Sequence, residues 1–175
     1  MVRDIVIYPD KRLKIVSKPV ENFDSSLHEL LDDMYDTMVA KNGVGLASIQ
    51  IGEPLRVLII NEPLDNIAEG EVEQPKENTL EIINPIIIEK RGKTKYQEGC
   101  LSVPGVYEDI ERYKYAKIEY QDRYGAKHTI EDSDFLAIAI QHEIDHLDGK
   151  IFIEKLSFTK RKKFEKEWKK RLKTS

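Results

Sequence analysis

The chain has 175 residues, of which 40% are hydrophobic and 34% charged, and its formal net charge is -4. This length suits one domain that buries a core without disulfides, and the composition is typical of a globular protein. The net charge gives no overall reason to expect nucleic-acid binding. The sequence contains no signal peptide, no run of eighteen apolar residues and a single cysteine, so we expect a cytoplasmic protein.

The first predicted element is a helix over residues 26–39, where leucines and methionines recur at helical spacing. Ser26 and Glu29 form a capping box at its start, and Asn42-Gly43 ends it. A segment with three glycines, residues 42–52, follows this helix.

The middle of the chain is predicted to be a sheet. β-branched and aromatic residues recur in residues 56–60, 80–90 and 113–122, and the last run turns at "DRYG" into residues 126–131. Residues 61–79, between the first two strands, are acidic and contain prolines, which predicts a surface loop.

Two further helices are predicted after the strands. Ser133 can cap the first, and Gly149 can end it. The second, over about residues 157–173, places Phe164, Trp168 and Leu172 four apart among lysines. The order of elements predicts one α+β domain over residues 1–175, with mixed and antiparallel strands around a central helix and a helix toward each terminus.

The central helix carries the sequence His-Glu-x-x-His. His142 and His146 are four residues apart and share a helix face, so both rings can reach one metal ion, with Glu143 beside them. The alternative is a surface helix with unrelated histidines. The preceding "LAIAIQ" predicts a buried helix, where imidazoles and a carboxylate are costly unless something binds them, so a metal site is favoured.

The third metal ligand is predicted to be Cys100. It lies in "YQEGCLSVPG", which Gly99 and Pro104 indicate to be a shaped loop. The alternative is a lone cysteine acting as a small buried hydrophobe. His28, on the polar side of the first helix, and His128, on an edge strand, are predicted to be surface residues.

Three motifs identify a resemblance. They are "GVGLASIQ" at residues 43–50, "EGCLS" at 98–102 and "QHEIDHL" at 141–147, supported by "YPDKRLK" near the start and "INP" at 83–85. In this order and over nearly the whole chain, they resemble the peptide deformylases. The resemblance implies a metal-dependent hydrolase that removes the formyl group from the N-terminal formyl-methionine of new polypeptides and releases formate.

The resemblance also implies roles for individual residues. Cys100, His142 and His146 bind one divalent ion, expected to be Fe(2+) in the cell, with Zn(2+), Ni(2+) or Co(2+) in the purified protein. Glu143 is the general base, and the Gln50 amide and Leu101 N–H stabilise the developing charge. The implied substrate-binding positions are Val44, Gly45, Tyr96, Gly99, Phe135, Ile138 and Ala139. Without the other motifs, Gln50 would be read as an ordinary polar residue after a glycine loop. The alternative for the apolar substrate-binding positions is that they belong to the ordinary hydrophobic core.

The sequence also departs from the family pattern. Ser48 stands where the motif usually has alanine, and its hydroxyl can bond to nearby backbone. Tyr107 lies where some members carry an arginine that the resemblance associates with the C-terminal direction of the substrate. Glu98 and Arg112 match the family and are predicted to pair and brace the cysteine segment.

Charge is divided unevenly along the chain. Residues 159–175 hold nine basic and two acidic side chains, so the preceding 158 residues sum to -11. One interpretation is a solvated helix whose Phe164, Trp168 and Leu172 pack on the domain. The other is a helix that binds a polyanion, for which the resemblance implies ribosomal RNA as the partner. The resemblance also implies formylmethionyl peptides and nascent chains as substrates. No membrane partner is expected.

Two rival functions share some of these features. A metallopeptidase also uses His-Glu-x-x-His, but it lacks the cysteine ligand in "EGCLS". A non-catalytic binding module would hold a closed structural metal with four protein ligands, and the sequence offers no evident fourth. Glu143 would then have no role.

Overall fold

The computed structural model describes residues 1–64 and 73–174. Its α-helices are α1 (Ser25–Ala40), α2 (Phe135–Leu147) and α3 (Phe158–Thr174). Its strands are β1 (Gly45–Ala47), β2 (Val57–Ile60), β3 (Leu80–Arg91), β4 (Thr94–Cys100), β5 (Val103–Arg112), β6 (Tyr115–Gln121) and β7 (Lys127–Asp132). The centre of the predicted acidic loop, residues 65–72, lies outside the described residues. The α+β prediction is confirmed.

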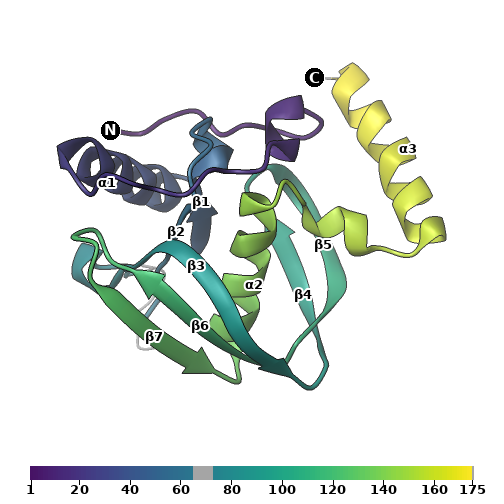
Figure 1. The fold of residues 1–175 in the computed structure, drawn as a ribbon. Coiled ribbons are helices and arrows are strands. Elements are labelled where there is room, and N and C mark those ends of the chain that lie inside the picture. Colours follow the sequence, from purple (N-terminus) through teal and green to yellow (C-terminus); the bar gives the residue numbers. More distant parts are fainter. Residues whose placement is uncertain (65–72, 175) are drawn as a thin grey trace.

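Five strands form one antiparallel sheet in the order β1-β2-β3-β6-β7, and β4 pairs with β5 in a separate hairpin. Figure 1 shows α2 between this sheet and the hairpin, α1 on the opposite side of the sheet, and α3 beside β5. The expected central helix is therefore α2, and both layers around it contribute to the site.

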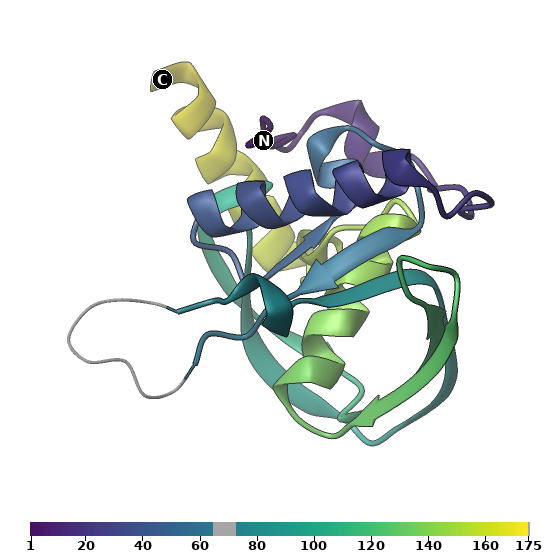
Figure 2. The same cartoon turned by 90° about the vertical axis from the view of Figure 1, so that its left-hand side faces the viewer.

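Strand β2 explains why helices cover both faces of the sheet. All four of its residues are buried, and successive side chains of a strand point to opposite faces. Val57 and Ile59 pack in a core with the leucines and methionines of α1, whereas Leu58 and Ile60 pack in a second core with Ile140 and other residues of α2. Figure 2 shows α2 enclosed by the curved sheet on the side away from α1.

The start of α1 differs from the prediction. Asp24, not Ser26, is the N-cap, and its carboxylate accepts from the Leu27 N–H. Asp is as good an N-cap as Ser, and Asp24 lies two residues before Ser26. At the other end Asn42 takes the left-handed conformation at φ 58°, while Gly43 does not need it.

The β4–β5 hairpin was not predicted, and the interpretation of residues 96–105 as a loop is wrong. Cys100 is the last residue of β4, and Pro104 and Gly105 lie inside β5. Apolar residues are few in this hairpin, and Gly99, Pro104 and Gly105 interrupt them, so it lacks the alternation of apolar residues that identifies a strand. Pro is tolerated on such an edge strand.

The N-cap of α2 is Asp134 rather than Ser133. The Asp132 carboxylate accepts from the N–H groups of Asp134 and Ala137. Gly149 ends the helix as predicted, at φ 74°, and a Cβ there would lie 2.5 Å from the Lys14 carbonyl oxygen. The end of α2 therefore packs directly on the N-terminal segment.

Helix α3 lies against a third core. Phe164 and Trp168 are 5% exposed, and the Trp168 indole N–H donates to the Tyr8 carbonyl at 3.0 Å. Leu172 is 46% exposed, so the predicted apolar stripe is buried only in its first two residues. Within the described ranges, no helix is long and apolar enough to cross a bilayer.

Candidate metal centre

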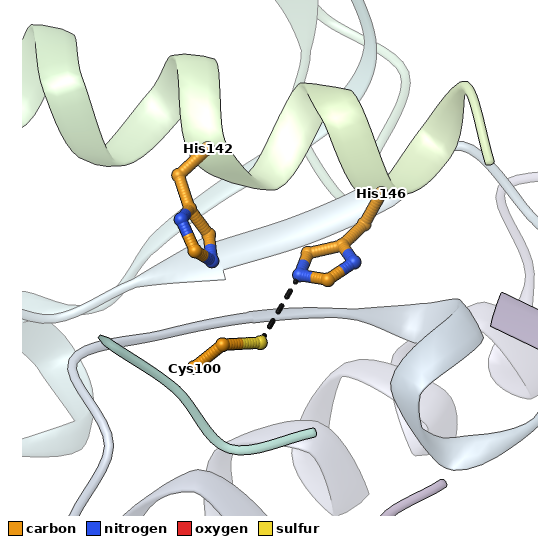
Figure 3. Close-up of side chains that lie close together, drawn as sticks. All are labelled: Cys100, His142 and His146. Atoms are coloured by element: carbon orange, nitrogen blue, oxygen red, sulfur yellow. Dashed lines mark hydrogen bonds between the residues drawn. The ribbon is translucent and has the colours of Figure 1, made fainter. Parts of the chain in front are cut away.

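Three side chains from two elements meet between the sheet and the hairpin. His142 and His146 point from one face of α2 toward Cys100 at the end of β4, as Figure 3 shows. One ligand atom from each lies within 4.8 Å of the others, and the Cys100 Sγ is 3.4 Å from the His146 Nε2. The helix spacing thus produces the shared face that the sequence predicted.

His142 is oriented by a buried ion pair. Its Nδ1–H donates to the Glu98 carboxylate at 2.8 Å, which leaves Nε2 for the site. Arg112 donates to both Glu98 oxygens at 2.8 Å and also to the Asp145 carboxylate on α2. The predicted pairing of Glu98 and Arg112 is confirmed, and it joins the hairpin to α2 as well as bracing the cysteine segment. A histidine ligand whose other nitrogen bonds a carboxylate is held in one tautomer and orientation.

The electrostatics of the cluster favour a positive charge. Burial opposes protonation of His142, but hydrogen bonds with Cys100 and Glu98 raise its pKa well above the ordinary value. Burial and the neighbouring His142 lower the pKa of His146 well below the ordinary value. A divalent cation can supply the positive charge that the acidic groups favour while both imidazoles stay neutral.

The donor set fits a divalent transition metal. One thiol sulfur and two imidazole nitrogens form the mixed set that Zn(2+), Fe(2+), Co(2+) and Ni(2+) accept. No fourth Cys, His, Asp or Glu joins the cluster in the described part of the chain. Three protein ligands leave a coordination position open, as a catalytic rather than a structural site requires.

Glu143 lies beside the candidate metal ligands without belonging to that group. It is 5% exposed, its Oε1 is 3.8 Å from the His142 Nε2, and its Oε2 is buried with no hydrogen-bond partner among the described residues. Burial raises its pKa to about 7. A Cβ on Gly45 would come within 3.0 Å of Oε1, so this glycine leaves space for the carboxylate.

Gln50 is held by hydrogen bonds at both ends of its amide. Its Oε1 accepts from the Ala47 N–H at 2.9 Å, so Nε2 must face the site, where it donates to Ser102 Oγ at 3.1 Å and contacts Cys100 Sγ at 3.4 Å. Ser102 was not among the predicted site residues, although its place in "EGCLS" was a signal. Ser48, two residues before Gln50, donates its hydroxyl to the Leu55 carbonyl, as expected.

A cavity of about 480 Å³ opens beside the cluster. All the substrate-binding positions expected from the sequence line it: Val44, Gly45, Tyr96, Gly99, Phe135, Ile138 and Ala139. Gln50, Leu101 and Glu143 line it too. Tyr107 packs its ring against Gly99, where a Cβ would come within 2.7 Å of the ring.

The other two histidines, His28 and His128, lie outside the candidate metal site. His128 is exposed on the edge strand β7 and pairs with Asp122, as predicted for a surface residue. His28 is half-buried rather than fully on the surface, because its Nε2 bonds to the Arg123 carbonyl at 2.9 Å. Neither belongs to the metal cluster.

Comparisons with known proteins agree with this geometry. The family model for polypeptide deformylase matches residues 2–162. The peptide deformylase of Nautilia profundicola is 53% identical over 172 residues, which cover 98% of this chain and 96% of that protein. That of Wolinella succinogenes is 54% identical over 171 residues, which cover 98% of each chain. The crystal structure of peptide deformylase from Ehrlichia chaffeensis is 40% identical with a TM-score of 0.86, and the match covers 100% of this chain and 99% of that one. The chain belongs to the polypeptide deformylase family.

Proposed function

We propose that this chain hydrolyses the N-terminal formyl group of formylmethionyl peptides at the Cys100, His142 and His146 centre and releases formate. The observation that carries the proposal is the convergence of these three side chains beside Glu143, whose buried Oε2 has no hydrogen-bond partner among the described residues. Cys100, His142 and Glu143 all line one cavity. Residues 1–175 would act as one catalytic unit, because α3 shares a core with the strand that follows Cys100.

The proposed metal is Fe(2+) in the cell, with Zn(2+), Ni(2+) or Co(2+) as replacements in purified protein. A bound divalent ion supplies Lewis acidity, which polarises the formyl carbonyl and lowers the pKa of water at the open position. Affinity orders place Fe(2+) below Co(2+), Ni(2+) and Zn(2+), so the metal recovered depends on what is available during purification.

Glu143 is the proposed general base and acid. Its raised pKa of about 7 suits a group that must both accept and give up a proton near neutral pH. It takes the proton of the attacking water and delivers it to the leaving amine nitrogen. The buried, unpartnered Oε2 supports this role, because an atom left without a protein partner is available to the reactants.

Gln50 and Leu101 are the proposed donors to the formyl oxygen. Negative charge gathers on this oxygen as water attacks, and fixed N–H donors stabilise it without reorganising. Both residues line the cavity beside Cys100. The Ala47 bond to Oε1 supports the role of Gln50, because it keeps the NH2 group turned toward the site.

The apolar wall of the cavity is proposed to bind the methionine side chain. The Tyr96 and Phe135 rings pack at a centroid distance of 5.7 Å, and Ile138 and Ala139 follow on the adjacent turn of α2. An unbranched thioether fits an irregular apolar space of this kind. Val44, Gly45 and Gly99 provide the main-chain side of the same cavity.

The direct test is the product formed from formyl-Met-Ala-Ser by anaerobically purified protein. We expect formate and the intact free-amine peptide, and loss of both after the metal is removed by a chelator. Release of methionine without formate would instead identify a peptidase, and no reaction with tightly bound metal would identify a binding module.

We further propose that the protein acts in the cytoplasm and contacts ribosomal RNA through α3. Phe164 and Trp168 face the domain, while the lysines of α3 are exposed. Phosphate-rich surfaces attract such a face and release counterions on binding. Deleting residues 160–175 would also remove both buried aromatic residues, so replacing charges is a cleaner test than truncation.

The test variant replaces four exposed lysines of α3 with glutamine: Lys162, Lys166, Lys169 and Lys173. A control makes the same change of charge on the strands and turns, at Lys90, Lys93, Lys95 and Lys114. We expect ribosome binding to weaken about tenfold or more in the first variant alone, with a smaller salt dependence, because fewer phosphate contacts remain. Equal binding by both variants would contradict the proposal.

A further inference from the structure

The two ends of the segment 61–79 are joined by hydrogen bonds among described residues. The Leu64 N–H donates to the Glu73 carbonyl at 3.1 Å. The Asn61 side-chain amide donates to the Pro75 carbonyl and to the Thr79 hydroxyl, both at 2.9 Å. These bonds build a defined base next to the end of β2, independent of residues 65–72.

Gln74 connects this base to the candidate active site. Its Nε2 donates one hydrogen to the Gly43 carbonyl at 2.9 Å and the other to the Asn61 carbonyl at 2.8 Å. Its own carbonyl accepts from the Tyr35 hydroxyl of α1 at 2.6 Å. Both donors of one amide are therefore used to join three separate segments: the end of α1, the end of β2 and the segment that returns to β3.

The Gly43 carbonyl belongs to the wall of the cavity. Gly43, Val44 and Gly45 all line it, and two glycines in three residues leave this backbone with little restriction of its own. The Asn61 N–H donates to the Val44 carbonyl at 2.8 Å, and Gln74 donates to the preceding carbonyl. Neither Asn61 nor Gln74 is among the residues that line the cavity, so the wall is held by residues behind its lining.

Gly43 also contacts the proposed catalytic groups. A Cβ on Gly43 would lie 2.7 Å from Leu101 Cδ1, so the wall is packed closely against the residue whose N–H is a proposed donor to the formyl oxygen. A shift of the Gly43 carbonyl would therefore move the part of the cavity wall that packs against Leu101.

We propose that Gln74 is a positioning residue for substrate binding: its amide fixes the Gly43–Gly45 wall against which the formylated peptide lies. This rests on the proposed function. Gln74 touches neither the metal ligands nor Glu143, so its loss should raise KM and leave kcat nearly unchanged. A residue that only stabilised the fold would change the fraction of active protein instead, and KM would stay the same.

The test compares formate release from formyl-Met-Ala-Ser by the wild type, Gln74→Ala and Gln74→Glu, each loaded with the same metal. Alanine removes both donors, and glutamate keeps the size of the side chain but faces two carbonyl oxygens with a carboxylate. We expect KM to rise about three- to tenfold in Gln74→Ala and at least as much in Gln74→Glu, with kcat within about twofold of the wild type.

Lys76→Met is the matched control. Lys76 lies two residues along the same base and pairs with Asp32 of α1 at 3.0 Å, without bonding to the cavity wall. We expect its KM to equal that of the wild type. An unchanged KM in Gln74→Ala, or an equal rise in Lys76→Met, would overturn the inference, as would a normal KM in Gln74→Glu. If the wild type released no formate, the proposed function itself would fail, and this result is distinguishable from the others.

Discussion

Helix α2 is mostly buried, whereas helix α3 is mostly exposed to solvent. Of the 13 residues of α2, nine are buried, including both histidines and Glu143, whereas α3 buries only two of its 17. Burial in α2 raises the pKa of Glu143, the residue proposed to move the proton. In α3 the lysines remain exposed. The proposed reaction therefore belongs to the buried helix, and the proposed contact with a large partner belongs to the exposed one.

The largest expected effect is the loss of a ligand to the metal. Cys100→Ala removes the sulfur that faces both histidines, and the remaining imidazoles hold a divalent ion weakly. We expect metal content, measured by elemental analysis after gel filtration, to fall to about a tenth or less, and formate release with it. Full metal content in this variant would mean that the ion binds elsewhere.

Gln50→Ala should reduce the rate while leaving the metal bound. Removal of one donor to a developing oxyanion typically costs about a hundred- to a thousandfold in kcat. Ser48→Ala is the control, because Ser48 is equally buried two residues away but bonds to the Leu55 carbonyl and not to the site. A similar loss of kcat in both variants would show that local packing, not the amide, is responsible.

Arg112→Met tests how much the buried ion pair between Arg112 and Glu98 contributes to the free energy of unfolding. It leaves Glu98 buried without its cation, and breaking a buried pair in this way costs about 3–5 kcal/mol. Arg91→Met, in an exposed pair with Glu89, should cost less than about 1 kcal/mol. Urea denaturation of both variants with metal bound checks this difference, and equal costs would contradict the importance of burial.

The smallest effect is expected on α3. Trp168→Phe removes the indole N–H that bonds to the Tyr8 carbonyl but keeps an aromatic ring in the third core. We expect stability to fall by about 1 kcal/mol and kcat on short formyl peptides to stay within twofold. A large loss of kcat would mean that α3 takes part in the reaction, and the contrast with α2 would fail.

Much of the fold was predictable because its strongest patterns are local. The helices follow from apolar spacing, and β2, β3, β6 and β7 follow from recurring β-branched and aromatic residues. The β4–β5 hairpin could not be recognised, since its apolar residues are few and are interrupted by glycine and proline. The N-caps were misplaced by two residues at α1 and by one at α2, because Asp24 and Asp134 stand next to serines that suit the same role equally well.

The candidate site residues that lie in short sequence motifs could be predicted from the sequence. Cys100, His142, His146 and Glu143 come from short sequences whose residue types are those the chemistry needs. Ser102 lies inside the "EGCLS" motif, but only the fold shows that its hydroxyl accepts a hydrogen bond from Gln50. Gln74 lies outside the motifs, and its bond to the Gly43 carbonyl depends on distant segments coming together, which no local pattern records.

The most direct test of the central claim is Glu143→Gln with its metal content measured. Glutamine keeps the volume that Gly45 leaves open but cannot take a proton from water. We predict a full complement of metal, an unchanged fold and a loss of formate release of at least about a hundredfold, the lower end of what positioned acid–base groups contribute. Activity near that of the wild type, with metal bound, would contradict the assignment of Glu143 as the group that moves the proton.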